Sequence, residues 1–328
     1  MSIKTRAALL RGPYDIDLVE KELVCGENEV IVKNNLIGIC GSDKSFYRGH
    51  LPKNTGASRK EPKFPFELGH ESGGVVVEAG SKVTDYKVGD HVMAFGWNNN
   101  YADYFKTPTW QLQPAPEGLD PDLASLGEPI SCAMYSGMNC RVQLGDTVVV
   151  MGAGFAGQII AQCVKKKGAY QVIMVDVLDG KLQIAKKLGA DVIINSKKTD
   201  VYDAVMELTH GVGADVVVEA AGTQESFNTA SRIIRHNGKF VFYSWVTQPI
   251  TLDISRWHDD GLEFVNTCLV HHTWHHRFVW TPEVLRPVQQ GTINIKSLIT
   301  NEFKLADLKK GFELADKDDS AIKIVFRP

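Results

Sequence analysis

The stretch "DTVVVMGAGFAG" at residues 146–157 decides the fold of the second half of the chain. A short apolar run, typical of a strand buried on both faces, leads into Gly152, Gly154 and Gly157, which have G-x-G-x-x-G spacing. A helix-forming segment follows directly. In that context the first glycine allows a tight turn, the second lets the backbone approach a pyrophosphate, and the third lets helix and strand pack closely. The stretch therefore predicts a dinucleotide-binding turn.

The acid that follows this turn indicates which dinucleotide binds. "QVIMVDV" (171–177) is predicted as the next strand, and its Asp176 lies 19 residues after Gly157, close to the ~20 expected for the acid that binds the ribose. Its charge would repel a 2′-phosphate, and no arginine follows to bind one, so NAD is favoured over NADP. The residues expected to contact the cofactor are Gly152, Gly154, Phe155, Ala156, Gly157, Asp176, Lys181, Ala221, Gly222 and Tyr243.

The glycine turn opens a region in which apolar strands alternate with helices. Such alternation is typical of βαβ units, which build a parallel sheet with helices on both faces. We therefore predict a doubly wound Rossmann domain over residues 133–272. Its later elements are predicted as the helix "KLQIAKKLGA" (181–190), the strand "DVIIN" (191–195), the helix "DAVMELTHG" (203–211), the strand "ADVVVEAAG" (214–222), the helix "ESFNTASRIIRHNG" (225–238) and the strand "KFVFYSW" (239–245).

The N-terminal third is rich in strands. "ENEVIVKNNLIGIC" (27–40) and residues 73–95 show β-branched alternation broken by Gly, Asn and Asp. The C-terminal part departs from the strand–helix rhythm and finishes on "AIKIVFR" (321–327), which is predicted as an edge strand. We expect residues 1–132 and 273–328 to form one β-rich domain, so the fold class is α/β with two domains.

Composition limits the possible partners. The 328 residues carry a net charge of −3 and a pI near 6.4, which argues against a nucleic-acid binder and favours a small-molecule partner. The six cysteines are scattered without a CxxC pair, as expected for reduced thiols in the cytoplasm. No run approaches the ~20 apolar residues that span a bilayer, so no membrane partner is expected.

A histidine and two acids stand among glycines in "FELGHESGG" (66–74), and candidate partners lie elsewhere. Cys40 follows a predicted strand in "IGICGSD" (37–43), and Glu128 lies in "LGEPISC" (126–132), predicted as a loop. The thiolate of Cys40, the imidazole of His70 and the carboxylate of Glu128 together suit zinc with one open position. Taken singly, each residue is more often a buried thiol, a loop histidine or a solvated acid.

The order of these motifs resembles one known family. "GICGSD", "GHE", "VGDHV", "EP" and "GAGFAG", in this sequence, are similar to the zinc-containing medium-chain dehydrogenase/reductase family, and the resemblance covers essentially the whole chain. It implies a GroES-like β-rich catalytic domain beside the Rossmann domain. It also implies catalytic zinc ligands at Cys40, His70 and Glu128, the last lying 24 residues before Gly152 as an acidic third ligand does in relatives.

The resemblance implies further roles near the metal. Glu71 resembles the family's acid that can enter the zinc shell. Ser42 is expected to accept the substrate proton, and Ser45 stands where many relatives place a histidine of the proton relay, which leaves the outer end of the relay open. No cysteine lies between Cys40 and Cys132, so the lobe that holds a structural zinc in relatives is missing and one zinc per subunit is expected.

Two further segments have alternative interpretations. The loop "RGHLPKNTGASRKEPKF" (48–64) carries five cations, Arg48, Lys53, Arg59, Lys60 and Lys63, and is either solvated surface or a lid that attracts anions. The cluster "HHTWHH" (271–276) has i, i+4 histidine pairs typical of a metal site, but a packed or interface segment is favoured.

The function expected from the sequence is reversible NAD-dependent oxidation of a secondary alcohol, of the polyol, sugar-derived or cyclitol type. A homodimer or homotetramer is expected. The alternatives are a zinc-free quinone or enone reductase of the same fold and a non-catalytic dinucleotide-binding protein.

Overall fold

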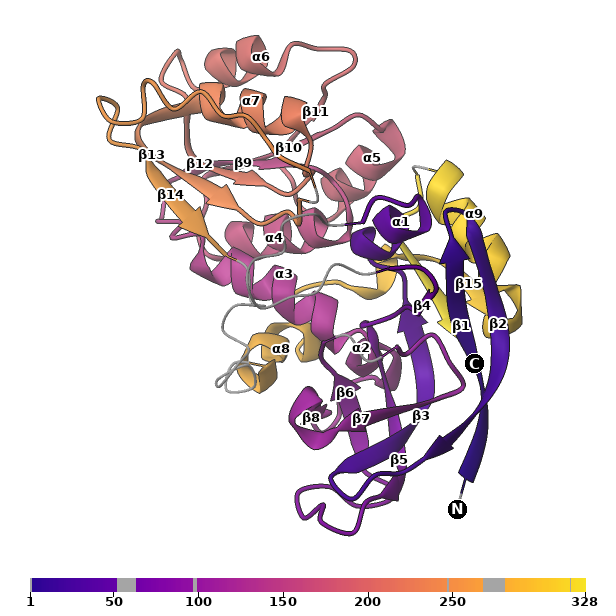
Figure 1. The fold of residues 1–328 in the computed structure, drawn as a ribbon. Coiled ribbons are helices and arrows are strands. Elements are labelled where there is room, and N and C mark those ends of the chain that lie inside the picture. The colour runs from indigo at the N-terminus through magenta and orange to yellow at the C-terminus, as the bar shows by residue number, and fades with distance from the viewer. Residues whose placement is uncertain (1, 52–62, 97–98, 247, 268–280, 319) are drawn as a thin grey trace. The chain divides into compact units, whose positions relative to one another are not determined.

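The computed structural model describes residues 2–51, 63–96, 99–246, 248–267, 281–318 and 320–328 (Figure 1). The chain divides into two compact units. One contains the described residues of 1–130, 278–290 and 295–328, and the other contains those of 131–277 and 291–294. The first change of unit falls within helix α3 (Gly127–Asn139). The expected boundary at 272/273 lies outside the described residues.

The second unit is built on a six-stranded parallel sheet in the order β11-β10-β9-β12-β13-β14. This order reverses direction between β9 and β12, as it does in doubly wound dinucleotide-binding sheets. The valines and isoleucines of β9, β10 and β12 are almost all buried, as expected for strands covered on both faces. The strands are β9 (Thr147–Met151), β10 (Gln171–Asp176), β11 (Val192–Asn195), β12 (Ala214–Glu219), β13 (Ile234–Phe242) and β14 (Glu263–Asn266).

Helices cover both faces of this sheet. In Figure 1, α4 (Phe155–Lys166) and α5 (Asp179–Lys187) lie on one face, and α6 (Val201–Leu208) and α7 (Gln224–Ile233) lie on the other. Residues of α6 and α7, including Val205 and Phe227, share a core with Val149 and Ile173 of the sheet. The predicted Rossmann architecture is therefore confirmed.

The end of α7 differs from the prediction. The helix stops at Ile233 rather than at Gly238, and β13 starts at once with Ile234 paired to Ala214. Asn237 adopts a left-handed conformation (φ 55°), which an α-helix excludes. Strand β14 was not predicted.

The first unit contains two sheets of mainly antiparallel strands. A three-stranded sheet has the order β2-β1-β4, and a larger sheet has the order β15-β16-β3-β5-β6-β8, with β7 also paired to β3. The strands are β1 (Ser2–Gly12), β2 (Asp15–Val24), β3 (Glu29–Gly38), β4 (Phe66–Glu67), β5 (Ser72–Ala79), β6 (His91–Ala94), β7 (Tyr104–Pro108), β8 (Leu112–Pro114), β15 (Ile299–Lys304) and β16 (Lys323–Arg327). The β-rich architecture predicted for this part is confirmed.

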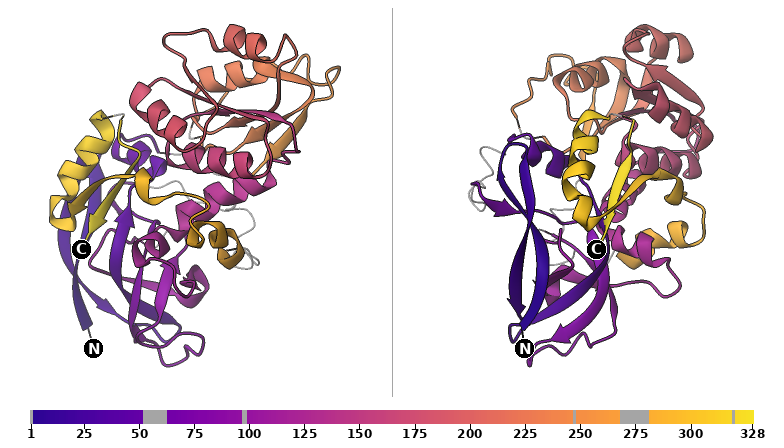
Figure 2. Two further views of the ribbon diagram at one scale, coloured as in Figure 1. Left: turned by 180° about the vertical axis from the view of Figure 1, so that it is seen from behind. Right: turned by 90° about the vertical axis from the view of Figure 1, so that its right-hand side faces the viewer.

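The C-terminal strand is not an edge strand, contrary to the prediction. β16 pairs in parallel with β15 and antiparallel with β3, so β15, which was not predicted, forms the edge. Figure 2 shows α9 (Leu308–Lys317) running beside these two strands, where its Phe312 packs on Phe326. The unit also contains α1 (Gly41–Tyr47), α2 (Pro121–Ser125) and α8 (Thr281–Gln289). In the described part of the chain, no helix is long and apolar enough to cross a bilayer.

Candidate functional site

Three potential metal ligands come together in the first unit. One ligand atom each from Cys40, His70 and Glu71 lies within 4.8 Å of the other two. Cys40 is the residue before α1, while His70 and Glu71 link β4 to β5. Gly69 permits this turn, because its φ is +114° and a Cβ there would lie 2.3 Å from Asn100 Oδ1. Among the described residues, no other group of three such side chains meets this closely.

The fully buried carboxylate of Asp43 lies next to Cys40 and His70 of the cluster. Asp43 Oδ2 accepts the Cys40 backbone N–H (3.0 Å) and the Tyr101 hydroxyl (2.8 Å), and its Oδ1 lies 3.6 Å from His70 Nδ1. A carboxylate facing Nδ1 leaves Nε2 as the nitrogen for a metal and makes the imidazole a better ligand. Asp43 and Tyr101 were not among the predicted site residues, although Asp43 is part of the motif that contains Cys40.

Electrostatics around His70 favour a positive charge. Burial alone lowers the pKa of His70, but the facing Asp43, together with Cys40 and Glu128, raises it well above its usual value. A buried site that stabilises a proton in this way also suits a divalent cation, which competes with the proton for the same ligands.

Glu71 has a second partner that the sequence analysis missed. Its Oε2 lies 2.7 Å from Lys323 Nζ, and both side chains are almost completely buried, at 1% and 3% exposure. Lys323 also donates to the Ile39 carbonyl (3.0 Å). The signal in the sequence was a lysine inside the apolar strand "AIKIVFR", because a buried lysine nearly always has an acidic partner.

The other predicted site residues of this unit are Glu128, Ser42 and Ser45. Glu128 lies in the first turn of α3 and not in a loop as predicted, because "GEPIS" starts a helix in which Pro129 occupies a first-turn position that needs no N–H. The negative charge of Glu128 raises the pKa of His70, but the Glu128 carboxylate is outside the three-ligand group. Ser42 Oγ is buried without a hydrogen-bond partner in the described structure, and Ser45 donates to Gly41 O within α1 (3.3 Å).

This donor set fits zinc. It combines a thiolate, an imidazole and a carboxylate, which is a ligand mixture that zinc accepts and that magnesium or calcium does not favour. The buried Ser42 Oγ and Asp43 Oδ1 near the ligands are polar atoms without hydrogen bonds among the described residues, as expected beside a polar ligand site.

The glycine turn in the second unit fits a dinucleotide. Gly152 has φ +102°, and a Cβ there would lie 3.0 Å from the backbone of Ala220 and Ala221. A Cβ on Gly157 would lie 1.9 Å from Gly152 O, whereas a Cβ on Gly154 would meet no atom within 4 Å. Gly154 therefore borders open space at the start of α4, where a pyrophosphate would bind beside Phe155 and Ala156.

Asp176 ends β10 beside this turn. Its Oδ2 accepts the Ala153 N–H (2.7 Å) and its Oδ1 accepts the Leu178 N–H (3.0 Å), so the carboxylate is held next to the glycines. The backbone of Lys181 is tied to the same turn, because Gln158 Nε2 donates to both Lys181 O (2.9 Å) and Ala153 O (3.2 Å).

The remaining predicted cofactor residues follow the next two strands. Ala221 and Gly222 donate their N–H groups to Glu219 Oε1, and Tyr243 N–H donates to Glu219 O. They therefore lie at the carboxyl edge of the sheet, where doubly wound folds bind ligands.

Two segments singled out in the sequence are mostly outside the described residues. Lys53, Arg59 and Lys60 of the basic loop, and the whole of 271–276, fall there. Of the described cations, Arg48 is engaged by Asp316 of α9, with 2.5 Å between Nε and Oδ1, and Lys63 is exposed.

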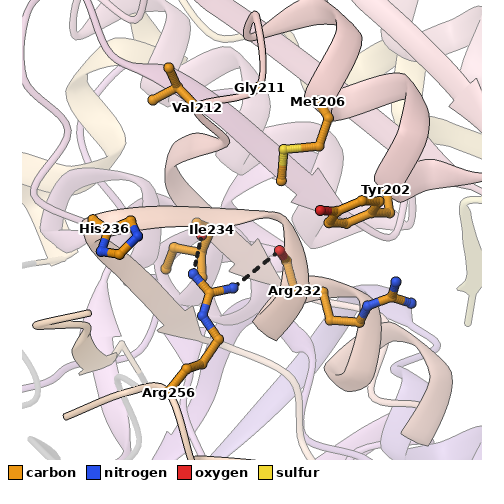
Figure 3. A pocket seen from close by; sticks show the side chains of 8 residues that line it. All are labelled: Tyr202, Met206, Gly211, Val212, Arg232, Ile234, His236 and Arg256. Atoms are coloured by element: carbon orange, nitrogen blue, oxygen red, sulfur yellow. Dashed lines mark hydrogen bonds between the residues drawn. The ribbon is translucent and has the colours of Figure 1, made fainter. Parts of the chain in front are cut away.

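A separate hollow of about 340 Å³ lies on the second unit at the amino end of β13 (Figure 3). Arg256 reaches into it and donates to Arg232 O (3.3 Å) and Ile234 O (3.2 Å), and it also pairs with Asp260. Its guanidinium therefore caps the carbonyls at the end of α7. The hollow is lined by Tyr202, Met206, Gly211, Val212, Arg232, Ile234, His236 and Arg256, none of which is a predicted site residue.

Comparison with known proteins agrees with both halves of this arrangement. An alcohol dehydrogenase GroES-like domain matches residues 26–117, and a zinc-binding dehydrogenase domain matches residues 156–280. Sorbitol dehydrogenase 1 of Saccharomyces cerevisiae is 31% identical to this chain, with 89% of this chain and 88% of the relative covered. L-threonine 3-dehydrogenase of Bacillus velezensis is 27% identical, with 92% of each protein covered.

A solved structure supports the same relationship. That of 2R,3R-butanediol dehydrogenase from Bacillus subtilis has a TM-score of 0.84 and 26% identity, with 99% of each chain covered. Since a zinc-binding dehydrogenase domain and its GroES-like companion both match, and a relative at 31% identity spans most of the sequence, the chain belongs to the zinc-containing medium-chain dehydrogenase/reductase family.

Proposed function

We propose that this chain is a zinc- and NAD-dependent dehydrogenase that reversibly oxidises a secondary alcohol of the polyol, sugar-derived or cyclitol type to a ketone. The observation that carries the proposal is the cluster of Cys40, His70 and Glu71 with Asp43 behind it. A quinone or enone reductase without zinc has no use for such a set of ligands.

In this proposal Cys40 and His70 hold one zinc, with Glu71 or Glu128 as the third ligand. When bound, zinc would act as a Lewis acid that lowers the pKa of the alcohol. Asp43 faces the imidazole of His70 from 3.6 Å, and Lys323 pairs with the carboxylate of Glu71. Ser42 would take up the hydroxyl proton and release its own proton outward, and Ser45 is the candidate for the outer part of that relay.

The dinucleotide is bound by the second unit. The turn at Gly152, Gly154 and Gly157 receives the pyrophosphate, and Asp176 accepts hydrogen bonds from the ribose hydroxyls. NAD supplies the hydride acceptor. We assign residues 1–132 and 273–328 to the catalytic domain and 133–272 to the dinucleotide domain.

The substrate class is supported by the names of the relatives. Sorbitol, threonine and 2R,3R-butanediol, the substrates named for the three relatives, each carry a secondary hydroxyl beside another polar group. We extend that class to this chain and expect a cytoplasmic homodimer or homotetramer.

The test is a screen of the purified full chain, loaded with zinc, against polyols and cyclitols with NAD and NADP. Reduction of NAD by at least one secondary polyol, with loss of activity after chelation and recovery with zinc, is the expected result. Full activity toward enones in metal-free protein would assign the reductase function instead. NADH binding without turnover of any alcohol or carbonyl would assign a non-catalytic role.

A further inference from the structure

A buried carboxylate ties together the chain segments that follow two neighbouring strands of the Rossmann sheet. Glu219, the last residue of β12, is completely buried. Its Oε1 accepts the N–H groups of Ala221 (3.0 Å) and Gly222 (2.8 Å) and lies 2.7 Å from the Ser226 hydroxyl. Its Oε2 accepts the hydroxyl of Ser244, just after β13.

No cation compensates this carboxylate among the described residues. Its negative charge is stabilised by two backbone N–H groups and two hydroxyls, and such charge-assisted hydrogen bonds are stronger than neutral ones. Burying a carboxylate is costly unless its hydrogen-bonding capacity is satisfied. The segments that supply the donors are therefore held firmly in one conformation.

These segments lie against the dinucleotide turn. A Cβ on Gly152 would lie 3.0 Å from the backbone of Ala220 and Ala221, and the Ala220 N–H donates to Met151 O at the end of β9. Asp176, on β10, marks the adenosine side of the turn. Because β12 and β13 lie on the other side of β9 in the sheet, the segments after them lie on the nicotinamide side.

We propose that Glu219 is a positioning residue for the nicotinamide half of the cofactor. It acts through Ser244. Because Glu219 accepts the Ser244 hydroxyl as well as the N–H groups of Ala221 and Gly222, it holds together the segments after β12 and after β13, which lie on the nicotinamide side. The adenosine half, held by Asp176 and α4, does not depend on these hydrogen bonds of Glu219. This inference rests on the proposed function, because it requires that the chain binds NAD.

The test compares two ligands on the full chain. NADH, followed by its fluorescence, reports both halves of the cofactor, and ADP-ribose, followed by calorimetry, reports the half without nicotinamide. Ser244→Ala removes the hydrogen bond that links the segment after β13 to Glu219. We expect it to weaken NADH binding about tenfold and to change ADP-ribose binding less than about twofold, as loss of one charge-assisted hydrogen bond predicts.

Two variants serve as controls. Ser231→Ala removes a buried hydroxyl that donates to Asn228 O within α7, away from the glycine turn, and should leave both affinities unchanged. Ser244→Thr keeps a hydroxyl and should restore NADH binding. A far-ultraviolet circular dichroism spectrum and melting temperature close to those of the wild type establish that Ser244→Ala is folded.

The outcomes separate the two claims. If the wild type binds neither NADH nor ADP-ribose, the proposed function itself is wrong. If the wild type binds both, and Ser244→Ala binds NADH as tightly as the wild type or weakens both ligands equally, then Glu219 does not position the nicotinamide.

Discussion

At the scale of single residues, the properties of the metal-ligand cluster depend on the side chains that contact its members. Cys40 and His70 were predicted from their motifs, but Tyr101 and Lys323 were not, because they approach the cluster from distant parts of the chain. Local sequence indicates which residue types can bind a metal. The partners that orient them follow only from the pairing of β16 with β3 and from the fold of residues 99–103.

The first prediction concerns the metal ligand Cys40. The wild type should contain about one zinc per subunit after dialysis, and Cys40→Ala should lose most of that zinc, because a thiolate is the strongest ligand of the set. NADH binding should persist, since the glycine turn is in the other unit. Metal is measured by plasma emission and NADH by fluorescence.

A matched control uses Cys25, a partly exposed thiol that donates to Glu29 O. Cys25→Ala should keep its zinc. Two zinc ions per subunit in the wild type, or an unchanged zinc content in Cys40→Ala, would contradict the assignment.

The second prediction concerns the choice of cofactor by Asp176. Replacing Asp176 by Ser and Val177 by Arg removes a charge that repels a 2′-phosphate and adds a partner for it. The ratio of kcat/KM for NADP to that for NAD should rise by a factor of at least about ten. Steady-state kinetics with both cofactors measure the ratio.

Asp179 serves as a control that shows whether loss of any negative charge in this region changes the cofactor ratio. It is an exposed acid that pairs with Lys198 in the same region. Asp179→Ser should leave the cofactor ratio near that of the wild type. Equal efficiency of wild-type protein with NAD and NADP would refute the role given to Asp176.

At the scale of elements, the parallel strands were predictable because strands covered on both faces read as continuous apolar runs. "TVVVM" and "DVVVE" are of this kind. Boundaries were less predictable: "RIIRHNG" has helix-forming residues, yet Ile234 pairs with Ala214 and Asn237 needs a left-handed backbone. The start of α3 at Gly127 was missed because glycine and proline usually indicate a loop.

The third prediction separates two glycines of the turn between β9 and α4. Gly157→Ala places a Cβ 1.9 Å from Gly152 O, so helix and strand must move apart and the variant should unfold several degrees below the wild type. Gly154→Ala meets no atom within 4 Å and has a negative φ, so its melting temperature should change little. Its methyl group instead enters the space expected for the pyrophosphate and should weaken NADH binding.

Differential scanning fluorimetry without ligand, followed by NADH titration, tests this pair. The expectation fails if Gly154→Ala binds NADH like the wild type or if Gly157→Ala melts at the wild-type temperature. The first result would remove the glycine turn from the cofactor site, and the second would show that the turn relaxes easily.

At the scale of the whole molecule, the sequence motifs predicted both architectures and missed how the C-terminal chain completes one of them. Residues 299–327 add β15 and β16 to a sheet begun by β3, so that β16 becomes internal. Such a pairing joins residues almost 300 positions apart, and no local pattern encodes it. The same return brings Lys323 to Glu71, so the missed strand pairing and the missed site residue have one cause.

The fourth prediction concerns the acid stability of the whole chain. Arg6 and Asp103 join β1 to the segment before β7 through two side-chain contacts, Nε to Oδ2 (2.8 Å) and Nη2 to Oδ1 (2.7 Å). The hydrogen bonds from Arg6 lower the pKa of Asp103 below its usual value of 3.8. A carboxyl with a lowered pKa in the folded state contributes stability above its unfolded pKa and loses it as the pH falls through the folded one.

Asp103→Asn should therefore lower the melting temperature at pH 7, and the difference from the wild type should shrink as the pH falls below about 4 and through the lowered pKa of Asp103. Because Arg6 is half exposed, the effect is modest, about 1 kcal/mol or less at pH 7, and 0.5 M salt should reduce it. Asp17→Asn, which breaks the more exposed pair with Arg11, should change little at either pH. A difference for Asp103→Asn that stays constant or grows as the pH falls would mean that the acid sensitivity of this protein comes from other carboxyls.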